Sequence, residues 1–187
     1  MASNSPKGSI LYLFSILIPP FIILSLVSSY GVAVPFLDQW ELASLLQKFS
    51  EDKLGLFDLW QQHNEHRIFF PKLIMLGLAW LSNWNIMLEL YTNVFLAGFI
   101  MVFLWLLLRQ CLNDCSFKTY WLLLLITSSL VFSAVQHENW TWGWQIQIFL
   151  SILATVISVW GVTGWPGQSK GLLISATSAV VASYSFN

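Results

Sequence analysis

The side chains of this sequence that could do chemistry gather in two polar stretches. The first covers residues 35–66 and the second covers residues 136–146. Together they hold all three histidines of the chain, which are His63, His66 and His137. Carboxylates and imidazoles are the groups that proteins use for proton transfer and for binding divalent metal ions. We therefore take these two stretches as the candidate site.

Asp38 directly follows a long apolar segment. A carboxylate at the exit of an apolar helix is poorly solvated unless it is paired, and such a position suits a general base or a metal ligand. The same position also suits a helix N-cap, with Glu41 three residues later in an arrangement that resembles a capping box. The two interpretations are compatible, and both stay open here.

A run of seven polar residues, from Gln61 to Arg67, stands immediately before a short apolar segment. His63 and His66 are spaced i, i+3, so they would share one face of a helix and could bind a metal ion. Their spacing matches neither of the two common His-Glu zinc signatures. Arg67 could clamp a phosphate bidentately, or it could extend its charge to the membrane surface.

The second stretch carries three alternating tryptophans, at positions 140, 142 and 144. Tryptophans in this pattern are typical of an interfacial belt, which is the simpler explanation, and Trp140 and Trp144 also suit stacking on the flat face of a sugar ring. Glu138 interrupts an otherwise uncharged hairpin. It is therefore a second candidate for a functional carboxylate.

The composition places these stretches in a membrane protein. Of 187 residues, only 8 are Lys or Arg and 9 are Asp or Glu, and 57 % are apolar. This is too little charge for a soluble surface. The composition thus excludes a soluble enzyme and a disordered regulator, and a net charge of −1 excludes a nucleic-acid binder.

The sequence predicts an all-α, polytopic helical bundle in a single membrane domain, residues 1–187. Apolar runs long enough to cross a bilayer define the predicted spans, which are residues 10–34, 86–108, 119–135, 147–164 and 172–187. Pro19-Pro20 should kink the first of them. Residues 39–49 form an amphipathic helix on the membrane surface. Residues 67–83 hold a short apolar helix with an internal Lys72, and we expect it to be juxtamembrane or re-entrant.

This topology sets the orientation. If 67–83 does not cross, an inside N-terminus puts Lys7, Arg109, Lys118 and Lys170 all on the cytoplasmic side of an inner or plasma membrane. The loop at 136–146, which has no Lys or Arg, then lies outside, as the positive-inside rule favours. Residues 35–85 and 136–146 should consequently share the outer face.

The polar motifs resemble those of a known group. Asp38–Glu41, then Gln62–Arg67 before Pro71, then Glu138–Trp140 are similar to motifs of largely uncharacterised bacterial multi-pass membrane proteins. The layout further resembles the N-terminal half of the GT-C superfamily. These are glycosyltransferases that take a sugar from a polyprenyl-phosphate donor.

The resemblance implies roles for the candidate residues. Asp38 would be the catalytic base or would hold a divalent cation, and Glu138 would be the second-loop acid near the donor phosphate. The remaining candidates would bind substrate or line the same cavity; they are Glu41, Glu65, His66, Arg67, Trp140 and Trp144. A metal ion, if present, would use Asp38, His63 or His66.

One departure from the superfamily is the length of the chain. GT-C enzymes are much longer, and this sequence ends inside an apolar segment, so we expect a fragment that is inactive alone. The alternative is a non-enzymatic membrane subunit or transporter-like protein that binds a partner or lipid head groups through its outer loops.

Overall fold

The computed structural model describes residues 6–112 and 115–186. Within them the chain is all-α, as predicted, and its only strand-like pairing is an isolated bridge between His63 and His66. The α-helices are α1 (Pro6–Tyr30), α2 (Glu41–Ser50), α3 (Leu56–Trp60), α4 (Phe69–Ser82), α5 (Ile86–Cys111), α6 (Phe117–Val131), α7 (His137–Thr141), α8 (Ile146–Gly164) and α9 (Ser169–Phe186). Three 3-10 turns connect them, η1 (Leu37–Trp40), η2 (Ala134–Gln136) and η3 (Gly143–Gln145).

Within the described residues, four helical segments are long and apolar enough to cross a membrane, which makes the chain an integral membrane protein. They are Tyr12–Tyr30, Ile86–Cys111, Phe117–Thr141 and Gly143–Gly164. They contain most of the predicted spans 10–34, 86–108, 119–135 and 147–164. The predicted span 172–187 corresponds to α9, which is not one of the four, and its last residue, Asn187, lies outside the described residues.

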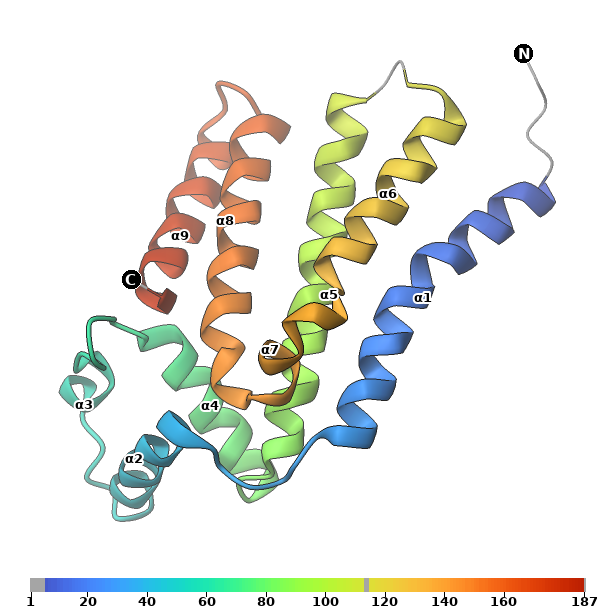
Figure 1. Cartoon of the computed structure of the whole chain (residues 1–187). Helices are drawn as coiled ribbons and strands as arrows, with labels where there is room; N and C mark the ends of the chain where they lie inside the picture. Colours follow the sequence, from blue (N-terminus) through green and yellow to red (C-terminus); the bar gives the residue numbers. More distant parts are fainter. Residues whose placement is uncertain (1–5, 113–114, 187) are drawn as a thin grey trace.

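The helix α4 is too short to cross a bilayer. Its 14 residues span about 21 Å, whereas a hydrocarbon core is about 30 Å thick. The chain therefore remains at one end of the bundle from the end of α1 to the start of α5. Figure 1 shows that α2, α3, α4 and α7 all lie at this end, opposite the α5–α6 and α8–α9 connections. We call it the site end.

Local sequence sets where the long helices begin. Asn85 caps α5 by accepting a hydrogen bond from the Met87 N–H at 3.0 Å. Ser116 caps α6 in the same way, with the Thr119 N–H as donor. Between α8 and α9 the chain reverses at Gly167, whose φ of +72° is a conformation that glycine adopts without strain.

The proline pair in α1 is compensated by a neighbouring helix. Pro20 has no N–H, so the carbonyl of Ile16, four residues earlier, loses its partner within the helix. The hydroxyl of Ser128 on α6 donates to this carbonyl at 2.7 Å, and Ser128 is fully buried. In a membrane such a carbonyl needs an internal partner. The hydrogen bond between Ser128 and Ile16 therefore fixes how α6 packs on α1.

Asn93 on α5 fastens the connection between α7 and α8. Its side chain is fully buried, and its Nδ2 group donates to the carbonyls of Asn139 and Trp142 at 3.2 and 3.1 Å. This connection carries several residues of the candidate site. Asn93 thus links the centre of the bundle to that site.

Replacing Asn93 by leucine should destabilise the protein. The change keeps the approximate volume but leaves two backbone carbonyls without their donor, which costs about 1–3 kcal/mol for each unsatisfied group. We expect a clear fall in the thermal unfolding temperature in detergent. The control is Thr92→Val, because the Thr92 hydroxyl bonds only a carbonyl of its own helix. Equal unfolding temperatures for the two variants would contradict this role.

Candidate functional site

A pocket of about 430 Å³ lies at the site end and unites the two polar stretches. Segments more than a hundred residues apart in the sequence build it: η1, the turn at 63–66, the start of α8 and the end of α9. The lining residues are Asp38, His63, Asn64, Glu65, His66, Trp142, Trp144, Gln145, Gln147, Ile148 and Phe186. The two stretches therefore share one end of the molecule, as the predicted topology requires.

The two histidines of the first stretch are not on a helix, contrary to the i, i+3 interpretation. Residues 63–66 form a tight turn in which His63 and His66 exchange two backbone hydrogen bonds of 2.8 Å. Asn64 adopts a φ of +51°, which asparagine tolerates better than most residues. The turn presents His63 inward and leaves Glu65 exposed at the pocket.

His63 is the central group of the pocket. Its Nδ1 lies 2.6 Å from Oε2 of Glu41, and its Nε2 lies 3.5 Å from Oδ2 of Asp38. The amide of Asn64 is 3.2 Å from the same Nε2. The imidazole is buried, and its edge packs on Trp144 with 5.1 Å between ring centroids.

These contacts favour one tautomer of the neutral imidazole. The Nδ1–H donates to Glu41, so Nε2 keeps its lone pair and can accept from the Asn64 amide. Protonation of Nε2 would place a second N–H towards the Asp38 carboxylate. Glu41 and Asp38 thus lie at the two ring nitrogens of His63, which places the imidazole between two carboxylates.

Asp38 does not cap a helix. The N-cap residue of α2 is Trp40, whose side chain makes no capping hydrogen bond. The capping interpretation of Asp38 is therefore wrong. The neighbouring Gln39 takes over the local bonding instead. Its Oε1 accepts the N–H of Phe36 at 3.0 Å, which leaves the carboxylate of Asp38 half-buried at the pocket.

A buried acid on α5 anchors this segment. The Nε2 group of Gln39 donates to Oε2 of Glu89 at 2.7 Å, and both side chains are buried. Nearby, Gly143 of η3 comes so close that a Cβ there would lie 2.5 Å from the Gln39 Nε2 and would also collide with Glu89. The indole of Trp142 donates to the carbonyl of Phe36 at 3.1 Å. The contacts around Gln39, together with the bond from Trp142, therefore join the η1 wall of the pocket to the η3 wall.

The sequence interpretation missed Gln39, Gly143, Gln145 and Gln147 as site residues. Glu89 was visible as the one acid near the end of a predicted span, which is a signal of function in membrane proteins. The three glutamines could not be recognised as site residues from the sequence, because glutamine is common in polar stretches. Their role emerges only from the approach of η3 to α5.

The other predicted site residues are divided between the pocket and its surroundings. His66 lines the pocket and stacks on Phe186, with ring centroids 4.9 Å apart. Arg67 is exposed and lies over the Trp60 ring at 5.5 Å, outside the pocket lining. Trp144 lines the pocket, but its side chain is buried, with 2 % of its surface exposed, so its role as a sugar platform stays a prediction.

Trp140 and Glu138 lie outside this pocket. The Trp140 side chain is fully buried, stacks on Phe132 and Phe149, and donates its indole N–H to the Ser133 carbonyl at 2.9 Å. Its place is in the core. Glu138 is exposed on α7 and does not line the pocket that contains Asp38.

Lys72 is a buried cation beside the site. Its Nζ donates to the carbonyl of Gln61 at 2.7 Å, so it holds the polar run against α4. Burial lowers the pKa of the Lys72 ammonium group, and the negative charge of Glu41 opposes part of this shift. Among the described residues, no group of three or more His, Cys, Asp or Glu side chains is arranged to hold a metal ion.

Comparison with protein-family models, with curated proteins and with solved structures finds no match for this sequence.

Proposed function

We propose that this chain is the site-bearing membrane part of a GT-C-type glycosyltransferase, which transfers a sugar from a polyprenyl-phosphate donor to a hydroxyl acceptor. One observation carries the proposal. Asp38, at the end of the first span, shares a pocket with His63, Glu65 and His66 beside the aromatic ring of Trp144. Carboxylates and imidazoles in one pocket suit proton abstraction, and the lining tryptophans give the pocket an apolar part next to them.

In this mechanism Asp38 accepts the proton of the acceptor hydroxyl. The acceptor oxygen forms a bond to the anomeric carbon of the donor sugar, the bond from that carbon to the phosphate oxygen breaks, and polyprenyl phosphate leaves with the bonding pair. His63, held by Glu41, would act as a positioning residue for the Asp38 carboxylate in the form that carries a proton on Nε2. The site lies at the end of the spans, where the head group of a lipid-linked donor resides.

We further propose that the site end faces the outside of an inner or plasma membrane and that the N-terminus is cytoplasmic. Arg109, Lys118 and Lys170 belong to the opposite end of the bundle, where α5 ends, α6 begins and α8 turns into α9 (Figure 1). The side chain of Lys7 lies outside the described side chains. Lysine and arginine in short loops favour the cytoplasmic side.

The test is an activity measurement on the purified full chain in lipid vesicles. It is incubated with a panel of radiolabelled polyprenyl-phosphate hexoses and pentoses and with soluble glycan acceptors, and release of the sugar from the lipid is followed. The pocket residues all belong to this chain, so, in place of the inactive fragment expected from the sequence, we expect sugar release from at least one donor, and loss of this release in Asp38→Asn. Absence of both donor binding and sugar release across the panel would overturn the proposal.

The second candidate is a non-enzymatic membrane subunit that binds a partner or lipid head groups. The position of Glu138 favours it, because the acid expected near the donor phosphate is exposed on α7 and apart from the Asp38 pocket. The same assay separates the two functions. Binding of the lipid-linked sugars without release, in the wild type as in Asp38→Asn, would favour the binding protein.

A further inference from the structure

We propose that the pocket at the site end is a subsite for an uncharged, hydroxyl-rich ring, and that Gln145 and Gln147 recognise its hydroxyl groups. The inference deepens the proposed function, because it assigns this pocket to the sugar or glycan acceptor and places the lipid phosphate elsewhere. It concerns residues to which the sequence interpretation gave no role.

The first support is a pair of carboxamides without partners. Gln145 lines the pocket with only 7 % of its surface exposed, and its buried Oε1 has no hydrogen-bond partner among the described residues. Gln147 lines the same wall and is 8 % exposed, and its side chain makes no hydrogen bond to a described residue. A buried polar group without a partner costs about 1–3 kcal/mol. The shielded Oε1 of Gln145 is such a group, whereas the carboxamide atoms that face the pocket are free to bond a ligand hydroxyl.

The second support is the aromatic wall beside them. Trp142, which is half-buried, lines the pocket next to Gln145, and its indole is held by its bond to the Phe36 carbonyl; Trp144 lines the same pocket but is buried. An indole ring offers an apolar surface to the C–H face of a pyranose, while carboxamides both donate to and accept from hydroxyls. The combination suits a flat ring that carries hydroxyls at its edge.

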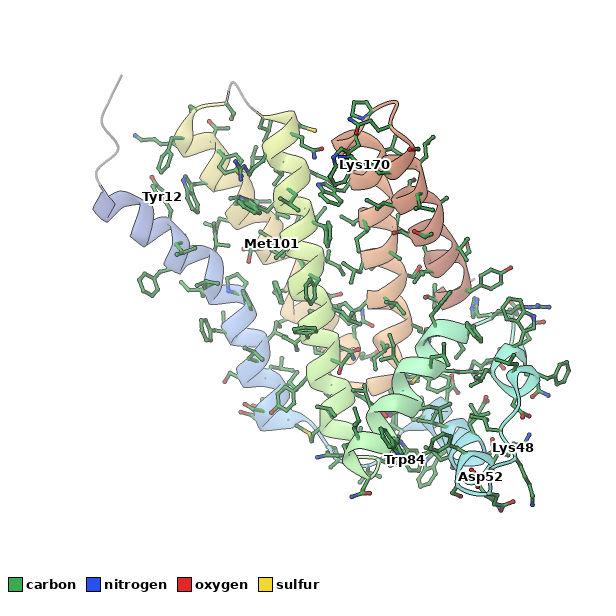
Figure 2. The ribbon with its side chains drawn as sticks, turned by 180° about the vertical axis from the view of Figure 1, so that it is seen from behind. Tyr12, Lys48, Asp52, Trp84, Met101 and Lys170 are labelled. Carbon is green, nitrogen blue, oxygen red and sulfur yellow. The ribbon has the colours of Figure 1, made fainter. Side chains whose placement is uncertain are left out.

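The third support is the charge of the pocket. None of the described residues that line it is Lys or Arg, and its carboxylates are those of Asp38 and Glu65. An anionic phosphate would therefore meet negative charge here. Figure 2 shows Lys170 at the opposite end of the molecule and Lys48 at the site end.

The cations of the site end are engaged outside the pocket. Lys48 pairs with Asp58 at 2.5 Å, and Lys53 pairs with Glu51 at 2.8 Å. Lys72 is bonded to a backbone carbonyl, and Arg67 lies over Trp60, as described above. His63 is already bonded to Glu41, and the ring of His66 is stacked on Phe186. These contacts leave the pocket suited to neutral ligands.

The test measures binding of methyl glycosides of common hexoses and pentoses to the full chain in detergent, by saturation-transfer NMR. The variants are Gln145→Met and Gln147→Met, since methionine keeps the length and shape of glutamine. The control is Gln47→Met, because Gln47 is exposed on α2 and bonds only Glu51. We expect at least one glycoside to bind, at least about tenfold weaker binding in the two pocket variants, and no change in the control.

A stability measurement separates recognition from a structural role. Since Oε1 of Gln145 has no partner in the fold, Gln145→Met should unfold at the same temperature as the wild type or higher. Weaker glycoside binding at unchanged stability supports the inference. A lower unfolding temperature that accounts for the lost binding would overturn it.

Competition with inorganic phosphate and glycerol phosphate completes the test. Neither should displace the glycoside; displacement, or binding of the phosphates alone, would overturn the inference, as would binding of no glycoside. The outcome is separable from that of the proposed function. Glycoside binding without sugar transfer would overturn the proposed transferase and support the subsite. Sugar transfer that is insensitive to Gln145→Met would support the transferase and overturn the subsite.

Discussion

Replacing Asp38 by asparagine should lower the rate of sugar transfer by about 10²- to 10⁴-fold, the usual contribution of a general base. Asparagine has nearly the same shape as aspartate but cannot accept the acceptor's proton. The local fold should persist, because the Asp38 side chain caps no helix and the segment is held by Gln39 and Glu89. The measurement is kcat and KM for the donor that the panel identifies.

The matched control is Asp58→Asn. Asp58 lies on α3 at the same end of the molecule, pairs with Lys48 and is outside the pocket. Its pKa is lowered mainly by the hydrogen bond from Lys48, so the substitution also removes an ionised carboxylate. We expect its kcat to be within twofold of the wild type. A kcat for Asp38→Asn within tenfold of this control would show that Asp38 is not the base.

The separate effects of the substitution on kcat and on KM would identify the role of Asp38 further. A base acts in the chemical step, so Asp38→Asn should lower kcat and leave donor binding nearly unchanged. Glu41→Gln should have a smaller effect on kcat, because Glu41 acts through the orientation of His63 and does not line the pocket. A large change in KM alone would instead assign Asp38 to binding.

The fold was largely predictable because the bilayer imposes it. An apolar run of about 20 residues has to become a helix when no water can satisfy its backbone, so hydropathy located the four segments that can cross a membrane. The shortness of 67–83 likewise indicated that α4 does not cross. From these two facts it followed that Asp38 and Trp144 belong to one end of the bundle.

The interior of the site was not predictable from local patterns. A spacing of i, i+3 is compatible with a helix face and with a tight turn, and the positive φ of Asn64 selects the turn between His63 and His66. Asp38 resembled an N-cap because Glu41 follows it three residues later, as in a capping box. In the structure the adjacent Gln39 makes the decisive contacts instead, and they depend on α5, 50 residues away in the sequence.

The Gln39–Glu89 pair explains how a short 3-10 turn holds Asp38 in place. A buried carboxylate is costly unless it accepts hydrogen bonds, and Gln39 supplies one to Oε2. The other oxygen, Oε1, accepts no hydrogen bond of normal geometry within the described part of the chain. Such a partly satisfied buried acid persists where it has a task. Here it fixes η1 against α5, next to η3.

Gly143→Ala should therefore be strongly destabilising. A Cβ at this position would lie 2.5 Å from Gln39 Nε2 and 2.8 Å from Glu89 Cβ, and it would collide with Glu89 Oε2. Overpacking of this kind costs about 1–3 kcal/mol, and loss of the charge-assisted hydrogen bond between Gln39 and Glu89 adds about 1.5–3 kcal/mol. We expect a large drop in the thermal unfolding temperature in detergent.

Gly98→Ala provides the comparison. Gly98 lies within α5, and a Cβ there would meet no atom within 4 Å. Alanine is the better helix former, so this variant should unfold at the wild-type temperature or slightly above it. If Gly143→Ala and Gly98→Ala unfolded at the same temperature, η3 could not be packed on the Gln39–Glu89 pair. The connection between α7 and α8 would then be held by Asn93 and Trp142 alone.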